Sequence, residues 1–262
     1  MPAANGSMLM STLHNMKAVL LVGGMGTRLR AVVASTPKPL ASVGSRSFLE
    51  LLVRQLRFQG IRRLVMCTGY LSDQIEKEFG DGHSWDVAIE YSREAQPLGT
   101  AGAVKLARSC LAGCPEFLVL NGDSFLELDL GQLVRFHQQQ GGLISITARR
   151  VENANRYGTV EVDAGGRVTG FAEKTGGEAP GLVNAGVYVF NRTVLDYIPE
   201  GPVSLERDIF PKLLEHGIYA LEQHGMFIDI GTPEDYARAQ QLCDRLYEAA
   251  SSGEQSSCAT KK

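Results

Sequence analysis

The chain has 262 residues, enough to bury a sizeable core as one large α/β domain or two small ones. Its 26 lysines and arginines against 29 aspartates and glutamates leave a net charge of −3, without the basic excess that is typical of nucleic-acid-binding proteins. No stretch approaches the ~18 apolar residues that a membrane-spanning helix needs. Neither nucleic acid nor a membrane is therefore an expected partner.

The five cysteines are scattered and have no histidine nearby at zinc-binding spacing. They indicate free thiols and a reducing, cytoplasmic location. We expect residues 1–16 to be a flexible extension, 17–248 to form a single domain and 249–262 to be a disordered tail of small and polar residues. No linker, repeat or low-complexity run interrupts the central range.

An apolar run that is typical of a buried first strand breaks at 20–30 into Leu-Leu-Val-Gly-Gly-Met-Gly-Thr-Arg-Leu-Arg. Glycine lets backbone N–H groups approach an anion, and arginine adds a charged fork. The residues concerned are Gly23, Gly24, Gly26, Arg28 and Arg30. A Walker loop is excluded because no Gly-Lys-Ser/Thr follows, and Leu29 occupies the third glycine position of a dinucleotide fingerprint. A glycine-rich turn without a ligand is the remaining alternative.

A second signal follows at 36–40, Thr-Pro-Lys-Pro-Leu. Two prolines fix φ on either side of Lys38, so we expect this lysine to be held against a ligand. A solvated surface lysine is the alternative when Lys38 is considered alone.

Helix and strand patterns then alternate along the chain. Apolar residues at helical spacing predict a helix over 47–59, with Ser47 as the N-cap and Gly60 as the stop. Further strands are predicted at 64–70, 87–91, 116–120, 142–148 and 183–190, a hairpin at 157–162 and 167–173, and helices at 72–79, 204–215 and 233–247. Such alternation favours parallel strands, with a ligand at their carboxyl ends.

The segment 96–108 predicts a loop followed by a helix that begins near Thr100 or Ala101. The free N–H groups at this helix start could meet a nucleobase edge or a phosphate. A Gly-Thr N-cap without a ligand is the alternative.

Two aspartates stand next to or within apolar segments. Asp123 follows the strand at 116–120, and Asp229 lies inside the apolar run 226–230, where an unpaired carboxylate would be costly to bury. Carboxylates in such positions suit Mg²⁺, which completes its shell with water and substrate phosphate. The alternative for Asp123 is an ordinary turn aspartate after Asn-Gly.

The glycine loop followed by Pro-Lys-Pro resembles the sugar-phosphate nucleotidyltransferases, also called sugar-nucleotide pyrophosphorylases. Further stretches match in the family's order: Pro-Leu-Gly-Thr-Ala-Gly at 97–102, Asn-Gly-Asp at 121–123, Phe-Ala-Glu-Lys at 171–174, Asn-Ala-Gly at 184–186 and Phe-Ile-Asp-Ile-Gly-Thr-Pro at 227–233. Together they cover Lys17 to about Arg245. The resemblance implies a Rossmann-like, GT-A-type α/β fold with a mixed, mostly parallel central sheet flanked by helices.

The resemblance also implies site residues. Arg28 should hold the leaving pyrophosphate and Lys38 the α-phosphate side, while Asp123 and Asp229 should bind Mg²⁺. The nucleotide-binding positions are Leu21, Gly23, Gly24, Gly26, Thr27, Gln96, Pro97, Gly99, Thr100, Asn121 and Gly122. The sugar-phosphate-binding positions are Tyr157, Gly158, Glu173, Lys174 and Asn184. Gln96 is a departure, since relatives that use guanine usually carry Glu before Pro-Leu-Gly-Thr.

The implied reaction transfers a nucleoside monophosphate from GTP to D-glycero-D-manno-heptose 1-phosphate, giving an NDP-sugar for a surface polysaccharide and pyrophosphate. The sugar phosphate is mostly dianionic at neutral pH, since its second pKa is about 6, so no general base is needed. The alternatives are mannose 1-phosphate with GTP, and UTP or dTTP with N-acetylmuramate or glucose 1-phosphate. Two further alternatives come from other functional classes of protein: a nicotinamide-dependent dehydrogenase, and a regulatory module that binds a sugar nucleotide without turnover. A homodimer is left open.

Overall fold

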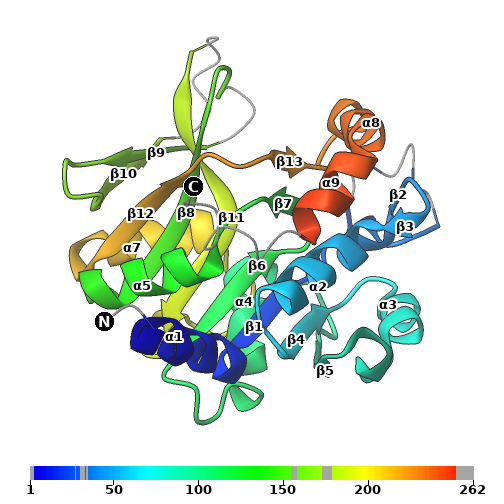
Figure 1. Ribbon diagram of the computed structural model, residues 1–262, viewed down its shortest axis with the longest axis horizontal. Coiled ribbons are helices and arrows are strands. Elements are labelled where there is room, and N and C mark those ends of the chain that lie inside the picture. Colours follow the sequence, from blue (N-terminus) through cyan, green and yellow to red (C-terminus); the bar gives the residue numbers. More distant parts are fainter. Residues whose placement is uncertain are drawn as a thin grey trace.

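A nine-stranded mixed sheet runs through the computed structural model, which describes residues 3–26, 28–29, 33, 35–154, 158–172 and 179–251 (Figure 1). Its strands are β1 (Lys17–Leu21), β4 (Arg63–Thr68), β5 (Ala88–Arg93), β6 (Glu116–Asn121), β8 (Ile144–Val151), β9 (Thr159–Val162), β10 (Val168–Ala172), β11 (Gly181–Asn191) and β12 (Ile218–Gln223). The central strands are rich in Val, Leu and Ile and are buried, as parallel strands covered on both faces are.

The middle of the sheet is parallel and its far side is mixed. Strands β5, β4, β1 and β6 run parallel in that order, with Val19 paired to both Val65 and Val119. The long strand β11 is antiparallel to β6 and then pairs with both β8 and β9. Strand β10 continues antiparallel from β9, and β12 pairs parallel with β8. The parallel strands therefore bring their carboxyl ends to one edge, where a ligand site is expected.

Helices cover both faces of this sheet (Figure 1). They are α1 (Ala3–Asn15), α2 (Phe48–Phe58), α3 (Ser72–Phe79), α4 (Gly99–Leu106), α5 (Leu130–Gln140), α6 (Val194–Tyr197), α7 (Phe210–Leu213), α8 (Pro233–Gln241) and α9 (Cys243–Ala250). Successive side chains of β1 enter different cores: Ala18 and Leu20 pack with α2 and α5, and Val19 packs with α4 and α7. The alternation follows from the two-residue period of a strand.

Two small strand pairs complete the fold. Strand β2 (Ser42–Val43) pairs with β3 (Arg46–Ser47), directly after the Pro-Lys-Pro segment. Strand β7 (Ser124–Leu126) pairs with β13 (Phe227–Asp229), which sets Asp229 opposite Ser124. The second pair brings the two predicted metal ligands together although they lie far apart in the sequence.

The predicted fold class is confirmed, and so are several elements. Helix α2 has Ser47 as its N-cap, whose Oγ accepts the N–H of Glu50, and helix α3 spans the predicted range. The predicted helix at 204–215 is instead a π-helical turn (Leu205–Ile209), α7 and a 3₁₀ turn (Leu214–His216). The predicted helix at 233–247 is divided into α8 and α9.

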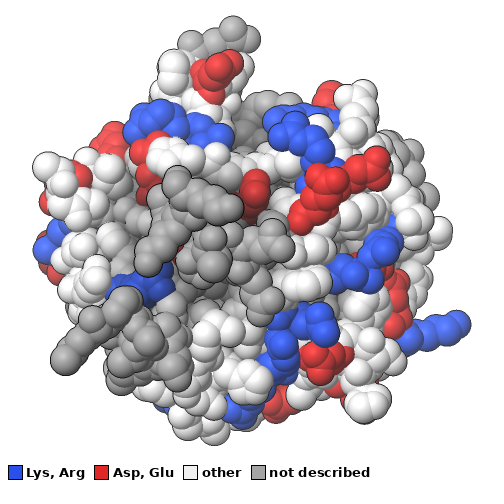
Figure 2. Space-filling model, viewed as in Figure 1, with Lys and Arg blue, Asp and Glu red and all other residues white. Residues whose placement is uncertain are grey.

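The N-terminal segment also differs from the expected flexible extension. It forms the helix α1, and Leu13 and Met16 at its end are buried in the core that includes α2 and α5. Helix α5 and strand β12 were not predicted. Among the described residues, no helix combines the length and apolar character of a membrane span. On the face shown in Figure 2, basic and acidic side chains are intermixed.

Candidate active site

A cavity of about 370 Å³ lies where the glycine loop, the Pro-Lys-Pro segment, the start of α4 and the end of β6 meet. Most of the residues that the sequence singled out line it: Leu21, Gly23, Gly24, Gly26, Arg28, Lys38, Pro97, Gly99, Thr100, Asn121, Gly122 and Asp123. Four stretches that are separate in the sequence therefore converge on one site at the carboxyl ends of β1 and β6.

Some predicted residues lie elsewhere. Gln96, Gly158, Asn184 and Asp229 are not among the lining residues, although Asp229 is next to them through the β7–β13 pair. Thr27, Tyr157, Glu173 and Lys174 fall outside the described residues. The cavity is also lined by residues that sequence reasoning missed: Met25, Pro39, Cys67, Glu94, Ala103 and Gly231. Glu94 follows directly after β5, so the rule that ligands bind at the carboxyl ends of parallel strands could have identified it.

A larger hollow of about 770 Å³ lies elsewhere on the surface, lined in part by Arg149, Arg150, Arg238 and Arg245. It contains none of the predicted site residues. Cavity volume alone would therefore select a site without the predicted residues. We place the candidate site in the smaller cavity because the sequence motifs converge there.

The glycine loop packs directly on the lysine segment. Gly26 has φ +56°, and a Cβ at this position would lie 2.9 Å from the Cβ of Lys38. A larger residue would be strained and would also press on Lys38. The glycine is thus required by its contact with Lys38 and by its backbone conformation.

Lys38 is held inside the site. It begins a 3₁₀ turn (Lys38–Leu40), Pro37 precedes it with φ −57°, and its side chain is only 10% exposed. Its Nζ lies 2.5 Å from Oδ2 of Asp123, which is 37% exposed. The ammonium group therefore points at a carboxylate in the cavity, and the surface-lysine alternative does not describe this residue.

Asp229 shares this charged cluster. Oγ of Ser124 lies 3.4 Å from Oδ1 of Asp123 and 3.3 Å from Oδ2 of Asp229, and the N–H of Gly231 donates to Oδ1 of Asp229 at 2.5 Å. Burial, followed by the charge of Asp123, raises the pKa of Asp229 to about 6, while Lys38 acts in the opposite direction. A carboxylate whose ionisation is disfavoured by burial and by a neighbouring carboxylate is suited to binding a cation.

Few of the side chains that the structure describes at the site could serve as metal ligands. Within the described ranges, no group of three or more His, Cys, Asp or Glu side chains is arranged to hold a metal ion. Mg²⁺ needs only one or two protein carboxylates, because water and substrate phosphate supply its other ligands. Asp123 and Asp229 therefore fit Mg²⁺ better than a metal that is enclosed by protein ligands.

Glu94, and not the expected Gln96, lines the cavity. Its Oε2 accepts the N–H of Leu98 at 2.7 Å, and its Oε1 would lie 2.6 Å from a Cβ on Gly23. The carboxylate is half-buried, and burial raises its pKa. Gln96 is exposed and does not line the cavity.

Two N–H groups at the start of α4 already have hydrogen-bond partners within the chain. The carbonyl of Val203 accepts the N–H groups of Ala101 at 2.9 Å and Gly102 at 3.2 Å. Oγ1 of Thr100 accepts the N–H of Leu205 and donates to Glu206, so Thr100 is not an N-cap. The expectation of free N–H groups is wrong for Ala101 and Gly102, because a neighbouring loop uses them.

Asn184 and the buried Tyr188 form a polar network. Nδ2 of Asn184 donates to the Tyr188 hydroxyl at 2.9 Å, and Oδ1 of Asn184 accepts the N–H of Gly186. Tyr188 is fully buried, and burial raises its pKa. Asn121 lines the cavity, and its Oδ1 is buried without a hydrogen-bond partner in the described part of the chain. Since buried polar atoms normally have partners, this oxygen is a candidate acceptor for a ligand hydroxyl.

The chain is similar to known proteins over most of its length. A family model described as Nucleotidyl transferase matches residues 17–245. A mannose-1-phosphate guanylyltransferase from Mycobacterium tuberculosis is 39% identical over 229 residues, which are 86% of this chain and 64% of that protein. The mannose-1-phosphate guanylyltransferase catalytic subunit beta of Drosophila melanogaster is 38% identical over 223 residues, 84% of this chain and 60% of that protein.

A solved structure gives the same result. The crystal structure of HddC from Yersinia pseudotuberculosis complexed with GMP-PN matches with a TM-score of 0.78 and 31% identity, over 87% of this chain and 99% of that one. The chain spans less than two thirds of the length of the two guanylyltransferases above. The family model nonetheless covers nearly all of the described fold, and the chain therefore belongs to the nucleotidyl transferase family.

Proposed function

We propose that the chain transfers a nucleoside monophosphate from a nucleoside triphosphate to a sugar 1-phosphate, releasing pyrophosphate. The observation that carries this proposal is the convergence of the glycine loop, Arg28, Lys38 and Asp123 on one cavity, with Asp229 beside it. Backbone N–H groups and cations suit a triphosphate, and a lysine held inside the cavity suits a phosphate that gains charge during transfer.

Both basic side chains, Lys38 and Arg28, have a proposed role in the transfer. The sugar phosphate oxygen attacks the α-phosphorus in line, and Lys38 stabilises the charge that develops there. Arg28 binds the leaving pyrophosphate with its fork of N–H groups. No side chain needs to remove a proton, because a phosphate monoester with second pKa about 6 is mostly dianionic at neutral pH.

Asp123 and Asp229 are proposed to hold Mg²⁺. When bound, the ion would neutralise triphosphate charge and help to fix its geometry. Support comes from the two converging carboxylates and from the raised pKa of Asp229. Lys38, paired with Asp123, would be available to the α-phosphate once the ion shares that carboxylate.

The proposed nucleotide is GTP. Two relatives are named guanylyltransferases, and the related HddC was crystallised with GMP-PN. Guanine presents N1–H and N2–H donors on one edge, and a carboxylate with two acceptor oxygens fits that edge. We therefore propose that Glu94, and not Gln96, accepts from the base, while Asn121 Oδ1 accepts from a hydroxyl of the nucleotide.

The sugar is the less determined substrate. The names of the relatives favour mannose 1-phosphate, and D-glycero-D-manno-heptose 1-phosphate, which the sequence suggested, remains the second candidate. UTP or dTTP with N-acetylmuramate or glucose 1-phosphate are the further combinations. Gly158 and Asn184 stay proposed sugar-phosphate contacts, together with Tyr157, Glu173 and Lys174.

Pyrophosphate release tests the proposal. The purified chain is mixed with Mg²⁺, one of GTP, UTP or dTTP, and each sugar 1-phosphate in turn. We expect rapid release with GTP and mannose or heptose 1-phosphate. Release in no combination, together with tight binding of a nucleotide sugar, would favour a regulatory module without turnover. The proposed location is the cytoplasm, and the proposed homodimer is tested by light scattering on the same sample.

A further inference from the structure

The two catalytic segments continue into elements that bind one another. The chain after Lys38 forms the β2–β3 hairpin, and the chain after Asp229 forms helices α8 and α9. Three side chains of these helices reach the hairpin, and we call Tyr236, Gln240 and Tyr247 the C-terminal clamp. The clamp therefore joins the segment that follows Lys38, the proposed catalytic lysine, to the segment that follows Asp229, a proposed metal ligand.

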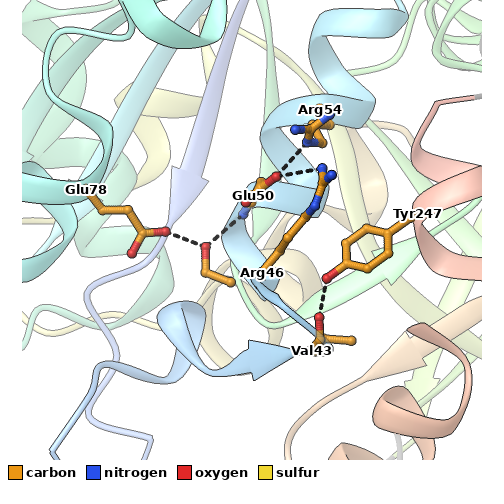
Figure 3. Close-up of polar contacts among 7 residues, drawn as sticks. Val43, Arg46, Glu50, Arg54, Glu78 and Tyr247 are labelled. Carbon is orange, nitrogen blue, oxygen red and sulfur yellow. Dashed lines mark hydrogen bonds and ion pairs between the residues drawn. The ribbon is translucent and has the colours of Figure 1, made fainter. Parts of the chain in front are cut away.

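The two tyrosines of the clamp bind consecutive carbonyls of β2. The Tyr236 hydroxyl donates to the carbonyl of Ser42 at 2.6 Å. The Tyr247 hydroxyl donates to the carbonyl of Val43 (Figure 3). Tyrosine suits this use, because its rigid ring carries the hydroxyl across a long distance at little cost in side-chain entropy.

Gln240 binds the hairpin in both directions. Its Nε2 donates to the carbonyl of Ser42, and its Oε1 accepts the N–H of Gly44 at 2.9 Å. Gly44 has φ +62°, and a Cβ there would lie 3.3 Å from the Cβ of Cys243. The amide therefore fixes the register of the turn, and the glycine allows α9 to approach it closely.

Arg46 links the hairpin to both α9 and α2. The Arg46 guanidinium lies 5.0 Å from the centre of the Tyr247 ring and pairs with Glu50 at 2.9 Å (Figure 3). Glu50 also pairs with Arg54, and the first turn of α2 is capped by Ser47. The hairpin is thus held between α2, which is mostly buried, and α9.

The short segment between Lys38 and the clamp is held by backbone hydrogen bonds. The Ala41 N–H donates to the carbonyl of Lys38 at 3.0 Å, and the Phe48 N–H donates to the carbonyl of Ala41 at 3.0 Å. Ser42, the first residue that the clamp binds, follows Ala41 directly. A displacement of β2 would therefore be transmitted to the Lys38 turn rather than absorbed by a loose linker.

We propose that Gln240 and Tyr247 are positioning residues, which hold the Lys38 ammonium group in place relative to Asp123 and Asp229. The proposal rests on the proposed role of Lys38 in the transfer. A purely structural clamp would stabilise the fold without acting through Lys38. Since a displacement of about 1 Å can cost on the order of a hundredfold in rate, a small shift of the Lys38 turn is enough to matter.

The test is a double-mutant cycle on the full chain. Tyr247→Phe removes one hydroxyl and keeps the aromatic ring under Arg46. Gln240→Ala removes both hydrogen bonds that the side-chain amide makes to the hairpin. We expect each to lower kcat by about tenfold, with the KM for GTP changed less than about twofold. In the Lys38→Ala background, both substitutions should have almost no further effect on kcat, because residues that act through one group are not additive.

Tyr91→Phe is the matched control. The Tyr91 hydroxyl donates to the carbonyl of Gly80 at 2.7 Å, so this variant loses the same kind of bond on the edge strand β5, outside the site. Its kcat should equal that of the wild type. Thermal unfolding of every variant establishes that each is folded at the assay temperature, and Tyr247→Phe alone suffices if Gln240→Ala does not fold.

The outcomes separate this proposal from the one on which it rests. If Lys38→Ala retains normal kcat, the role of Lys38 fails and the positioning role fails with it. If Lys38→Ala is strongly impaired while the clamp variants keep normal kcat, or lose the same factor in both backgrounds, only the positioning role is overturned.

Discussion

At the scale of single residues, Lys38 is the group on which the proposed chemistry depends most. Its side chain is only 10% exposed, and its ammonium group lies against Asp123 in the cavity. Lys38→Ala should lower kcat by a hundredfold or more with the fold intact, because one preorganised donor to a developing phosphate charge stabilises the transition state by about 3 kcal/mol. Steady-state rates and thermal unfolding measure both effects, and a near-normal rate would refute the role.

The two aspartates lead to a prediction about metal requirement. Asp123→Asn and Asp229→Asn each replace a charged oxygen ligand by a neutral one, so each should raise the Mg²⁺ concentration needed for half-maximal rate by about tenfold or more. Mg²⁺ titrations at saturating substrates measure this change. Full activity of the wild type in excess chelator would contradict both assignments.

Glu94 leads to a prediction about the nucleobase. Glu94→Gln replaces a two-oxygen acceptor by a carbonyl and an NH₂ group, which opposes a guanine donor. The preference for GTP over UTP and dTTP, taken as the ratio of kcat/KM values, should fall by at least tenfold. Gln96→Ala is the matched control, since Gln96 is exposed outside the cavity, and it should leave the ratio unchanged. An equal loss with all three nucleotides would show that Glu94 acts structurally.

At the scale of elements, local signals in the sequence succeed where one residue type decides the conformation. Ser47 caps α2, and its Oγ accepts the Glu50 N–H as the pattern predicts. The predicted helix at 204–215 is instead divided into a π-helical turn, which ends at Ile209, and α7, which begins at Phe210. Pro211 lies in the first turn of α7, where its missing N–H is tolerated, so a new helix start at this point agrees with the proline. The end of α8 at Leu242 has no comparable signal, since Leu242 is a good helix former.

Helix α5 contains a pH-dependent element. His137 is buried, its Nδ1 lies 2.9 Å from Oγ of Ser145, and burial lowers its pKa despite the nearby Glu116. Below the ordinary histidine pKa of about 6.5, the unfolded chain therefore binds more protons than the folded one, and stability falls as pH falls. The slope from one such group is at most about 1.4 kcal/mol per pH unit.

Urea unfolding at pH 7.5 and 5.5 tests this contribution. We expect the free energy of unfolding of the wild type to decrease toward pH 5.5, and His137→Asn to reduce that decrease. An unchanged pH dependence in the variant would assign the effect to other groups.

At the scale of the whole molecule, the sequence predicts the part of the site that the parallel sheet arranges. The glycine loop and Asp123 follow β1 and β6, neighbouring parallel strands, so their meeting follows from topology. Asp229 reaches them through the separate β7–β13 pair, whose three-residue strands carry no period strong enough to reveal their partners.

Glu94 was missed for a different reason. It lies two residues before Gln96, the position that the family resemblance marked, although its place directly after β5 is the strand-end position at which ligands bind. The clamp was missed because its contacts join residues about two hundred positions apart, and no local pattern predicts such pairs. Tertiary contacts therefore complete a site that local patterns outline.

The proposed reaction moves the α-phosphate of the nucleotide to the sugar phosphate. The most direct measurement follows GTP labelled at its α-phosphorus after mixing with the chain, Mg²⁺ and mannose or heptose 1-phosphate. We expect the label to appear in a nucleotide sugar that contains the added sugar, in equal amount to unlabelled pyrophosphate, and we expect Lys38→Ala to slow the formation of both products together. Label that stays in GTP with every sugar 1-phosphate, or that appears in GMP without a sugar product, would refute nucleotidyl transfer by this chain.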